Sequence, residues 1–256
     1  MQPQDKAAKK LDGRVAIVTG AGQGIGHGVA LCLAREGAHI VVNDLIQERI
    51  ARAVADVEAL GVQGNVARAD EVNQLVQETL SRFGKIDILV NNAGTAVNKP
   101  LIEQSEADWD KVLDVNLKGM FLCCRRVVPE MVKQKRGAIV NIASIAAFRY
   151  TTPHVPYAAS KAGVVVFTRD LAYEVGRYGV RVNAIAPGPI ETPLASSLLT
   201  PQQKQAYIRN VPLGRMGTPE DIGEAVAFLV SDAASFITGV TLPVSGGADI
   251  GPELTV

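Results

Sequence analysis

The chain alternates apolar, β-branched runs with segments of helical pattern along almost its whole length. The runs are nearly continuous rather than alternately apolar and polar, which indicates strands that are buried on both faces. Such strands belong to parallel sheets covered by helices, because parallel strands need long crossover connections. Strands are predicted at residues 14–19, 38–43, 86–91, 137–143, 180–186 and 239–244, with a weaker one at 62–66, and helices at 24–36, 47–59, 71–83, 107–134, 156–178 and 219–231.

This alternation predicts an α/β fold, a doubly wound parallel sheet with right-handed crossovers. The 256 residues suit one domain, and no Pro/Gly/Ser-rich linker divides them. Residues 1–10 are polar and are expected to form a mobile N-terminal arm before a single domain at 11–256. Residues 192–212 are the longest stretch outside the alternation, and we expect them to form a lid over a substrate.

Composition excludes several classes of protein. Lys plus Arg and Asp plus Glu each number 26, whereas a nucleic-acid binder normally carries a basic excess. No apolar run reaches the roughly 18–20 residues that span a bilayer. Cys32, Cys123 and Cys124 are too few and too close to form a disulfide framework, so a cytoplasmic location is expected. The three histidines do not cluster with them, and no metal site is expected.

A glycine-rich turn follows the first predicted strand and opens a helix. Its glycines, Gly20, Gly24 and Gly26, allow a tight turn and a close approach by a diphosphate, which the helix N-terminus would bind. Asp44 ends the second strand, 18 residues beyond Gly26, near the usual offset for a carboxylate that binds a ribose diol. A glycine turn alone could be an ordinary connection without a ligand. The combination with Asp44 favours dinucleotide binding.

The turn and five later motifs resemble the short-chain dehydrogenase/reductase family. Its TGxxxGxG, NNAG and YxxxK patterns occur in order at 19–26, 91–94 and 157–161, with Asn116 and Ser144 between them and Pro187–Thr192 after them. The resemblance covers residues 11 to 247. It implies a Rossmann-type sheet of about seven strands, NAD or NADP as cofactor, oxidation of an alcohol or reduction of a carbonyl, and a homotetramer.

Tyr157 and Lys161 are the expected acid/base pair. Four residues apart on a helix, they share one face. A free tyrosine hydroxyl has a pKa of about 10, and a nearby ammonium together with the positive nicotinamide ring would lower it. Tyr157 would then take the alcohol proton, or return it to a carbonyl. An isolated pair of this kind would more simply be part of an amphipathic surface.

The resemblance implies roles for other residues. Ser144, after a strand, would bond to the substrate oxygen, although turn serines are also common. Asn116 would bend its helix and hold a water that relays protons to Lys161. At Asn65-Val66 an amide replaces the carboxylate that many relatives offer to the adenine. The implied catalytic set is Asn116, Ser144, Tyr157 and Lys161, and the implied cofactor set is Gly20, Gln23, Gly24, Ile25, Gly26, Asp44, Asn65, Val66, Asn92, Ala93, Gly94, Tyr157, Lys161, Pro187, Gly188, Ile190 and Thr192.

The residue types near the expected site limit which cofactor and which class of substrate can bind. Gln23 and Leu45 offer no cation to a 2′-phosphate, so NAD is expected. The substrate set is Ser144, Ala146, His154 and Tyr157, within mainly apolar walls that include Leu194, Leu198 and Leu199. We therefore expect a neutral secondary alcohol or ketone. The alternatives are an NADPH-dependent 3-oxoacyl-carrier-protein reductase and, in another class, a non-catalytic dinucleotide sensor. A Ser–Lys hydrolase lacks its G-x-S-x-G elbow here.

Overall fold

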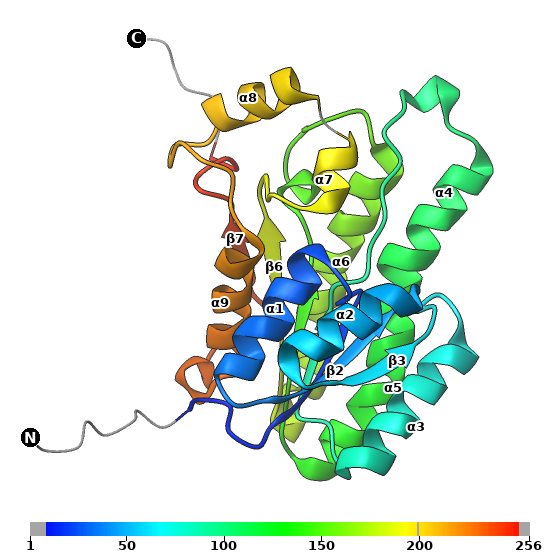
Figure 1. Ribbon diagram of the computed structural model, residues 1–256, viewed down its shortest axis with the longest axis vertical. Coiled ribbons are helices and arrows are strands. Elements are labelled where there is room, and N and C mark those ends of the chain that lie inside the picture. The colour runs from blue at the N-terminus through cyan, green and yellow to red at the C-terminus, as the bar shows by residue number, and fades with distance from the viewer. Residues whose placement is uncertain (1–8, 199, 251–256) are drawn as a thin grey trace, which may run out of the picture.

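The computed structural model describes residues 9–198 and 200–250, which form a single parallel sheet between two layers of helices (Figure 1). The predicted α/β class and the doubly wound, seven-stranded sheet are confirmed. Residues 1–8, most of the predicted N-terminal arm, lie outside the described residues. Within the described part of the chain, none of the helices has the length and apolar character needed to cross a membrane.

All neighbouring strands are parallel, in the order β3-β2-β1-β4-β5-β6-β7. The order reverses between β1 and β4, and the loops that leave their carboxyl ends diverge there. In open α/β sheets a ligand binds in the crevice at such a reversal. The strands are β1 (Val15–Thr19), β2 (His39–Asp44), β3 (Leu60–Gln63), β4 (Ile88–Asn91), β5 (Gly137–Ile142), β6 (Val180–Pro187) and β7 (Thr241–Val244).

Two apolar cores form, one on each face of the sheet. Along β1, Ile17 enters the core beneath α3, α5 and α6, and Val18 enters the core beneath α1, α2 and α9. This alternation explains why the strand is apolar throughout. The helices are α1 (Gly24–Arg35), α2 (Gln47–Val57), α3 (Ala69–Phe83), α4 (Glu106–Leu113), α5 (Gly119–Gln134), α6 (Val155–Val175), α7 (Pro193–Leu198), α8 (Pro201–Arg209) and α9 (Pro219–Val230).

Two predicted elements differ in the structure. The helix expected at 107–134 is divided into α4 and α5 by a π-helical turn at Asp114–Lys118. The third strand lies at Leu60–Gln63 rather than 62–66. This strand contains Gly61, where a Cβ would lie 2.5 Å from the Cγ2 of Ile50 on α2. The close packing of the strand on α2 therefore requires glycine at this position, and the glycine interrupts the apolar pattern by which a strand is predicted.

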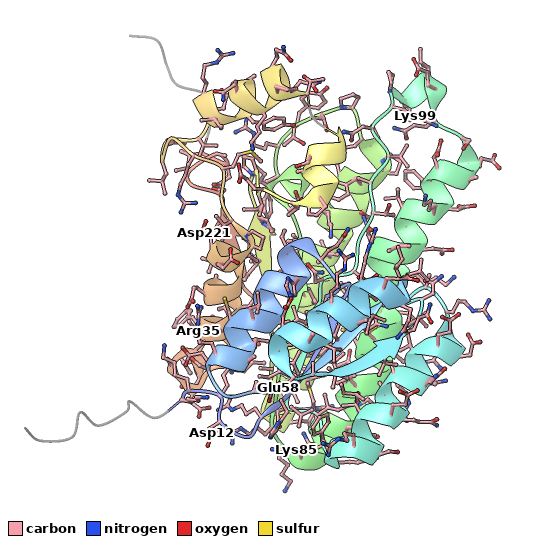
Figure 2. All side chains as sticks on the ribbon, viewed as in Figure 1. Asp12, Arg35, Glu58, Lys85, Lys99 and Asp221 are labelled. Carbon is pink, nitrogen blue, oxygen red and sulfur yellow. The ribbon has the colours of Figure 1, made fainter. Side chains whose placement is uncertain are left out.

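The segment expected to be a lid forms two short helices. In α8 the Thr200 side chain accepts from Gln203 N, and the Gln203 side chain accepts from Thr200 N, a reciprocal cap. Helices α7 and α8 lie together at the top of the molecule in Figure 1. Charged side chains such as Asp12 and Lys85 project at the opposite end (Figure 2).

Close packing of α1 on α9 predicts a difference between two glycine substitutions. A Cβ at Gly28 would lie 2.7 Å from the carbonyl carbon of Pro219, whereas a Cβ at Gly176 meets nothing within 4 Å. Because Gly176 is right-handed helical, alanine suits it. We expect Gly28→Ala to lower the free energy of unfolding by about 1–3 kcal/mol. Gly176→Ala, the matched control, should change it by between zero and a gain of about 1 kcal/mol.

Urea unfolding followed by circular dichroism measures both changes. Equal midpoints for the two variants would contradict the packing of α1 on α9.

Candidate active site

The glycine turn between β1 and α1 has the features of a diphosphate site. Gln23, the N-cap of α1, is extended, and no side chain among the described residues caps this helix. Its first N–H groups and its positive dipole end therefore point at the crevice. A Cβ at Gly22 would lie 2.8 Å from Asp44 Oδ2, so the turn accommodates only glycine there. These residues fit a dinucleotide.

Asp44 is fixed at the end of β2. Its Oδ2 accepts from Gly22 N at 3.1 Å and its Oδ1 from Ile46 N at 3.1 Å, and the residue is buried. The carboxylate is thus held beside the glycine turn, as a ribose-binding group requires. A Cβ at Gly22 would also lie 2.6 Å from Arg49 Cβ, on α2. The sequence analysis found no cation at this position, and the structure brings Arg49 to it.

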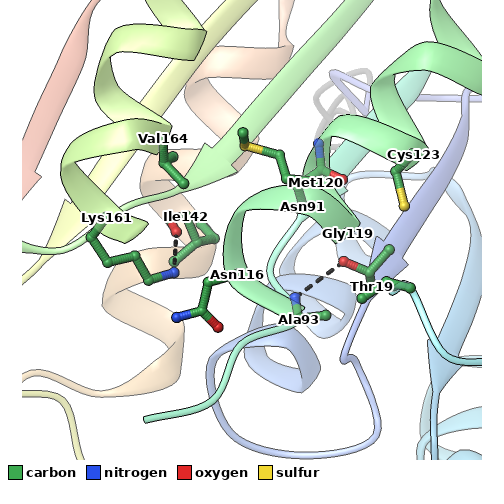
Figure 3. A pocket seen from close by; sticks show the side chains of 11 residues that line it. Thr19, Asn91, Ala93, Asn116, Gly119, Met120, Cys123, Ile142, Lys161 and Val164 are labelled. Atoms are coloured by element: carbon green, nitrogen blue, oxygen red, sulfur yellow. Dashed lines mark hydrogen bonds between the residues drawn. The ribbon is translucent and has the colours of Figure 1, made fainter. Parts of the chain in front are cut away.

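Asn92 braces the glycine turn. Its amide nitrogen donates to Thr19 O at 2.9 Å and to Gly20 O at 3.0 Å. The Thr19 hydroxyl accepts from the backbone nitrogens of Asn92 and Ala93 at 3.0 and 3.1 Å (Figure 3). This side chain, which the sequence analysis included in the cofactor set, therefore joins β4 to the turn after β1. Thr19 was missed as a functional residue, although it opens the TGxxxGxG pattern.

Asn116 lies in the π-helical turn, as its predicted local bend requires. Its Oδ1 accepts from Thr95 N at 2.8 Å. Its Nδ2 donates to Thr95 O at 2.9 Å and to Ser160 Oγ at 3.0 Å. The side chain is buried, and it joins the loop after β4 to α6 one residue before Lys161. Ser160 is a second residue that the sequence analysis missed.

Lys161 is almost completely buried, with 4% of its surface exposed. Its Nζ donates to Ile142 O at 2.7 Å (Figure 3). The same atom lies 5.5 Å from the centroid of the Tyr157 ring. Burial lowers the pKa of Lys161 from 10.5 to about 8, because the charged form loses its hydration. The ammonium is thus retained at neutral pH, at a cost in folding free energy.

Tyr157 and Ser144 lie beside each other at the carboxyl end of β5. Burial raises the pKa of Tyr157, and the nearby Ser144 hydroxyl opposes that rise. Ser144 Oγ also accepts from Ala146 N at 3.1 Å, which fixes its position. The expected lowering of the Tyr157 pKa is therefore not a property of the chain alone.

The other residues of the expected cofactor set are held mostly by backbone hydrogen bonds and by packing within the fold. Asn65 Oδ1 accepts from Ala67 N at 2.9 Å, which leaves its NH₂ group and one lone pair of the oxygen for an adenine. Val66 is buried against α5. Thr192 lies beside the glycine turn, its Cγ2 3.5 Å from a Cβ placed at Gly24. Gly188 N donates to Val244 O at 3.0 Å, and Ile190 is buried against Gly217, which positions the Pro187–Thr192 segment by contacts within the fold.

The expected substrate residues are only partly brought to the site. Ala146 is buried next to Ser144. Both ring nitrogens of His154 bond to threonine hydroxyls, so neither nitrogen is free for the substrate contact that was expected there. Leu199 lies outside the described residues, as do the side chains of Leu194 and Leu198.

A buried polar chain beneath the site was also missed. Asn91 Nδ2 donates to Asn141 Oδ1 at 2.8 Å, and Asn141 Nδ2 donates to Thr168 Oγ1 at 2.9 Å, joining β4, β5 and α6. Two asparagines inside apolar strand runs were the signal for it. Cys124 accepts from the same Asn91 amide at 3.3 Å, and burial raises the pKa of its thiol to about 12, so it is chemically inert.

The described part of the chain holds no group of three or more His, Cys, Asp or Glu residues that could hold a metal ion. A Rossmann-type sheet, a glycine turn at an uncapped helix and a partly buried tyrosine beside a buried lysine together define a dinucleotide-dependent oxidoreductase.

Comparisons with known proteins identify the family. A family model described as enoyl-(acyl carrier protein) reductase matches residues 20–249. A 3-oxoacyl-(acyl-carrier-protein) reductase of Thermotoga maritima is 40% identical over 93% of this chain and 98% of its own length. One from Synechocystis is 44% identical, over 93% and 97%. The crystal structure of levodione reductase superposes with a TM-score of 0.90 at 36% identity, covering 94% and 98% of the two chains. The chain belongs to the short-chain dehydrogenase/reductase family.

Burial of Lys161 predicts a pH-dependent stability. Between pH 8 and 10.5 the unfolded chain holds a proton on this lysine that the folded chain has released, so stability rises with pH across that window. Relative to Lys161→Met, which lacks the titration, the wild-type unfolding free energy should be lowest below pH 8 and should rise by about 3 kcal/mol towards pH 10.5.

Urea titrations of both proteins at pH 7, 8, 9 and 10 measure the difference. All other titrating groups are common to the two proteins and cancel. A difference that stays constant, or that falls with pH, would contradict a buried ammonium.

Proposed function

We propose that the chain transfers hydride between a nicotinamide dinucleotide and the 3-oxo or 3-hydroxy group of an acyl thioester. The observation that carries the substrate class is the identity of 40% and 44%, over more than nine-tenths of both chains, to two 3-oxoacyl-(acyl-carrier-protein) reductases. These comparisons favour the alternative of the sequence analysis over its first interpretation, a neutral alcohol or ketone. A sensor without turnover would not need the aligned Ser144, Tyr157 and Lys161.

Each side chain of the site has a separate role in the reaction. The nicotinamide supplies or accepts the hydride. In reduction, Tyr157 donates its proton to the carbonyl oxygen, and Ser144 donates a hydrogen bond to the same oxygen. The Lys161 ammonium stabilises the phenolate that remains, in a site where burial strengthens the attraction. Asn116 holds the Thr95 backbone and Ser160, and so fixes α6 against the loop after β4. In oxidation the proton moves from substrate to Tyr157.

A neutral secondary alcohol or ketone is the second candidate. The likeness to levodione reductase, at 36% identity over nearly the whole chain, supports it. The exposed Phe148 and the buried Ala146 beside Ser144 make this part of the site apolar. Under either candidate, residues 192–212 act as the lid.

For the cofactor we propose NAD(H). Asp44 is held by two backbone N–H groups beside the glycine turn, where its charge would repel the 2′-phosphate of NADP. Arg49, whose Cβ lies on the same side of Gly22 as the Asp44 carboxylate, acts in the opposite direction, since a guanidinium binds phosphate well. Two backbone hydrogen bonds fix the carboxylate, and we propose that its repulsion prevails.

For the assembly we propose a homotetramer. An apolar groove lies between the π-helical turn, α5 and α6, and its lining includes the half-exposed Phe121 and Val166. A second copy of the chain would cover this surface. Closed symmetry would then leave the catalytic end of each sheet open to solvent.

The substrate and cofactor are tested together by following absorbance at 340 nm. We expect a 3-oxoacyl thioester to exceed neutral ketones and keto acids by more than about tenfold in kcat/KM, or 1.4 kcal/mol in transition-state binding. The kcat/KM for NADH should exceed that for NADPH. The ratio of these two values should decrease in Asp44→Ala and increase in Arg49→Gln. A neutral ketone as best substrate would establish the second candidate, and a preference of the wild type for NADPH would overturn the role of Asp44.

Tyr157→Phe tests the acid/base assignment. It removes the proton and keeps the ring, so kcat should fall by at least about 100-fold. Dinucleotide binding, measured by calorimetry, should persist because the glycine turn and Asp44 are untouched. Tyr173→Phe, at a fully exposed tyrosine on the same helix, is the matched control and should leave kcat unchanged. Turnover of Tyr157→Phe near the wild-type rate would rule out the mechanism.

A further inference from the structure

His154 occupies a fixed position directly before the catalytic helix. It is the N-cap residue of α6, three residues before Tyr157. Its Nε2 lies 2.9 Å from the hydroxyl of Thr151, and its Nδ1 lies 2.8 Å from the hydroxyl of Thr152. A neutral imidazole has one donor and one acceptor nitrogen, and a hydroxyl can serve either. Both ring nitrogens are therefore satisfied without a substrate.

The ring fixed in this way lies against the catalytic tyrosine. The centroids of the His154 and Tyr157 rings are 4.9 Å apart, and their planes are inclined by 45°. Aromatic pairs at this distance are attractive in tilted geometries. The tyrosine hydroxyl is at the far end of its ring, so a small rotation displaces the proton that is transferred. A misplacement of about 1 Å can reduce turnover by about 100-fold.

The contact continues to α8. The Thr152 side chain lies beside the Tyr207 hydroxyl, whose pKa it acts to lower against the effect of burial. Arg149 and Tyr150, in the loop after η3 (Ile145–Ala147), are the other titratable groups that act on Tyr207. A row of neighbouring side chains thus runs from α8 through the loop to α6. In order, its members are Tyr207, Thr152, His154 and Tyr157.

We propose that His154 is a positioning residue: held at both nitrogens by Thr151 and Thr152, its ring fixes the orientation of the Tyr157 ring, and Tyr207 of α8 supports this arrangement through Thr152. The role rests on the proposed acid/base function of Tyr157. It differs from the substrate contact that the sequence suggested.

The neutral form of His154 suits this role. Burial lowers the pKa of His154 below its usual 6.5. The positive end of the α6 dipole and the Lys161 ammonium on the same helix also disfavour an imidazolium. The titratable group in contact with the ring is Tyr157. The other charged or titratable groups on the neighbouring elements are Lys161 on α6, Arg149 and Tyr150 in the loop after η3, and Tyr207 on α8.

The first experiment needs no substrate. The protein is labelled with ¹⁵N-histidine, and its three histidines are assigned by substituting His27 and His39. We expect the ring nitrogens of His154 to show one fixed neutral tautomer from pH 8 to pH 6.5. Thr152→Val and Tyr207→Phe should each shift the Nδ1 resonance, and the exposed Tyr173→Phe should not. Averaged tautomers, or an Nδ1 resonance that Thr152→Val leaves unmoved, would overturn the proposal.

The second experiment separates kcat from KM. His154→Phe keeps an aromatic ring and loses both hydrogen bonds, so kcat should fall about tenfold while the KM for the dinucleotide stays within about twofold. Thr152→Val should lower kcat about threefold. The double variant should be no slower than His154→Phe, because the two act through one contact. Unchanged kcat in His154→Phe, or losses that multiply in the double variant, would overturn the proposal.

The results of these two experiments distinguish a failure of the His154 proposal from a failure of the proposed function. If the wild type turns over no substrate of the panel, the proposed function fails, and the nitrogen resonances still decide the position of His154. If His154→Phe unfolds at lower urea than wild type, Thr152→Val supplies the kcat comparison in its place.

Discussion

All seven strands run in the same direction, and the rest of the site depends on this. Parallel strands end at one edge of the sheet, so the residues that follow β1, β4, β5 and β6 meet there although they are far apart in sequence. The Thr19–Asn92 contacts hold the first two of these loops together. The reversal of strand order between β1 and β4 leaves room between the loops for an extended ligand.

Burial is the second constraint, and it has opposite effects on the two central groups. It makes the Lys161 ammonium costly and lowers its pKa, while it raises the pKa of Tyr157. An unpaired buried cation is tolerated because Ile142 O accepts from it. Burial thus disfavours the charged form of both side chains, the Lys161 ammonium and the Tyr157 phenolate. This is a place where the fold gives up stability for function.

Much of the site was open to prediction because its signals are local. A glycine turn after a strand, a carboxylate at the end of the next strand, and Tyr and Lys four residues apart each reflect a period or a spacing that the sequence displays. The strand pattern fails at β3, where Gly61 is required by Ile50 of α2 rather than by the strand itself. The periodicity over 107–134 showed no break at its π-helical turn, because the side chains of a π turn remain compatible with helical spacing, and the bend at Asn116 was implied by the family resemblance alone.

The sequence by itself determined the class of fold and the glycine turn at the start of the first helix, since hydrophobic period and short-range spacing encode them, and its resemblance to a family supplied the candidate reacting side chains. Tertiary structure alone decided what each polar group contacts. It assigned the Asn92 amide to the glycine turn, brought Arg49 to Gly22, linked Asn91 to Asn141 and Thr168, and placed the His154 ring on Tyr157. Hydrogen bonds of this kind join residues from different strands and helices, and their partners are chosen by the packing of those elements and not by distance along the chain.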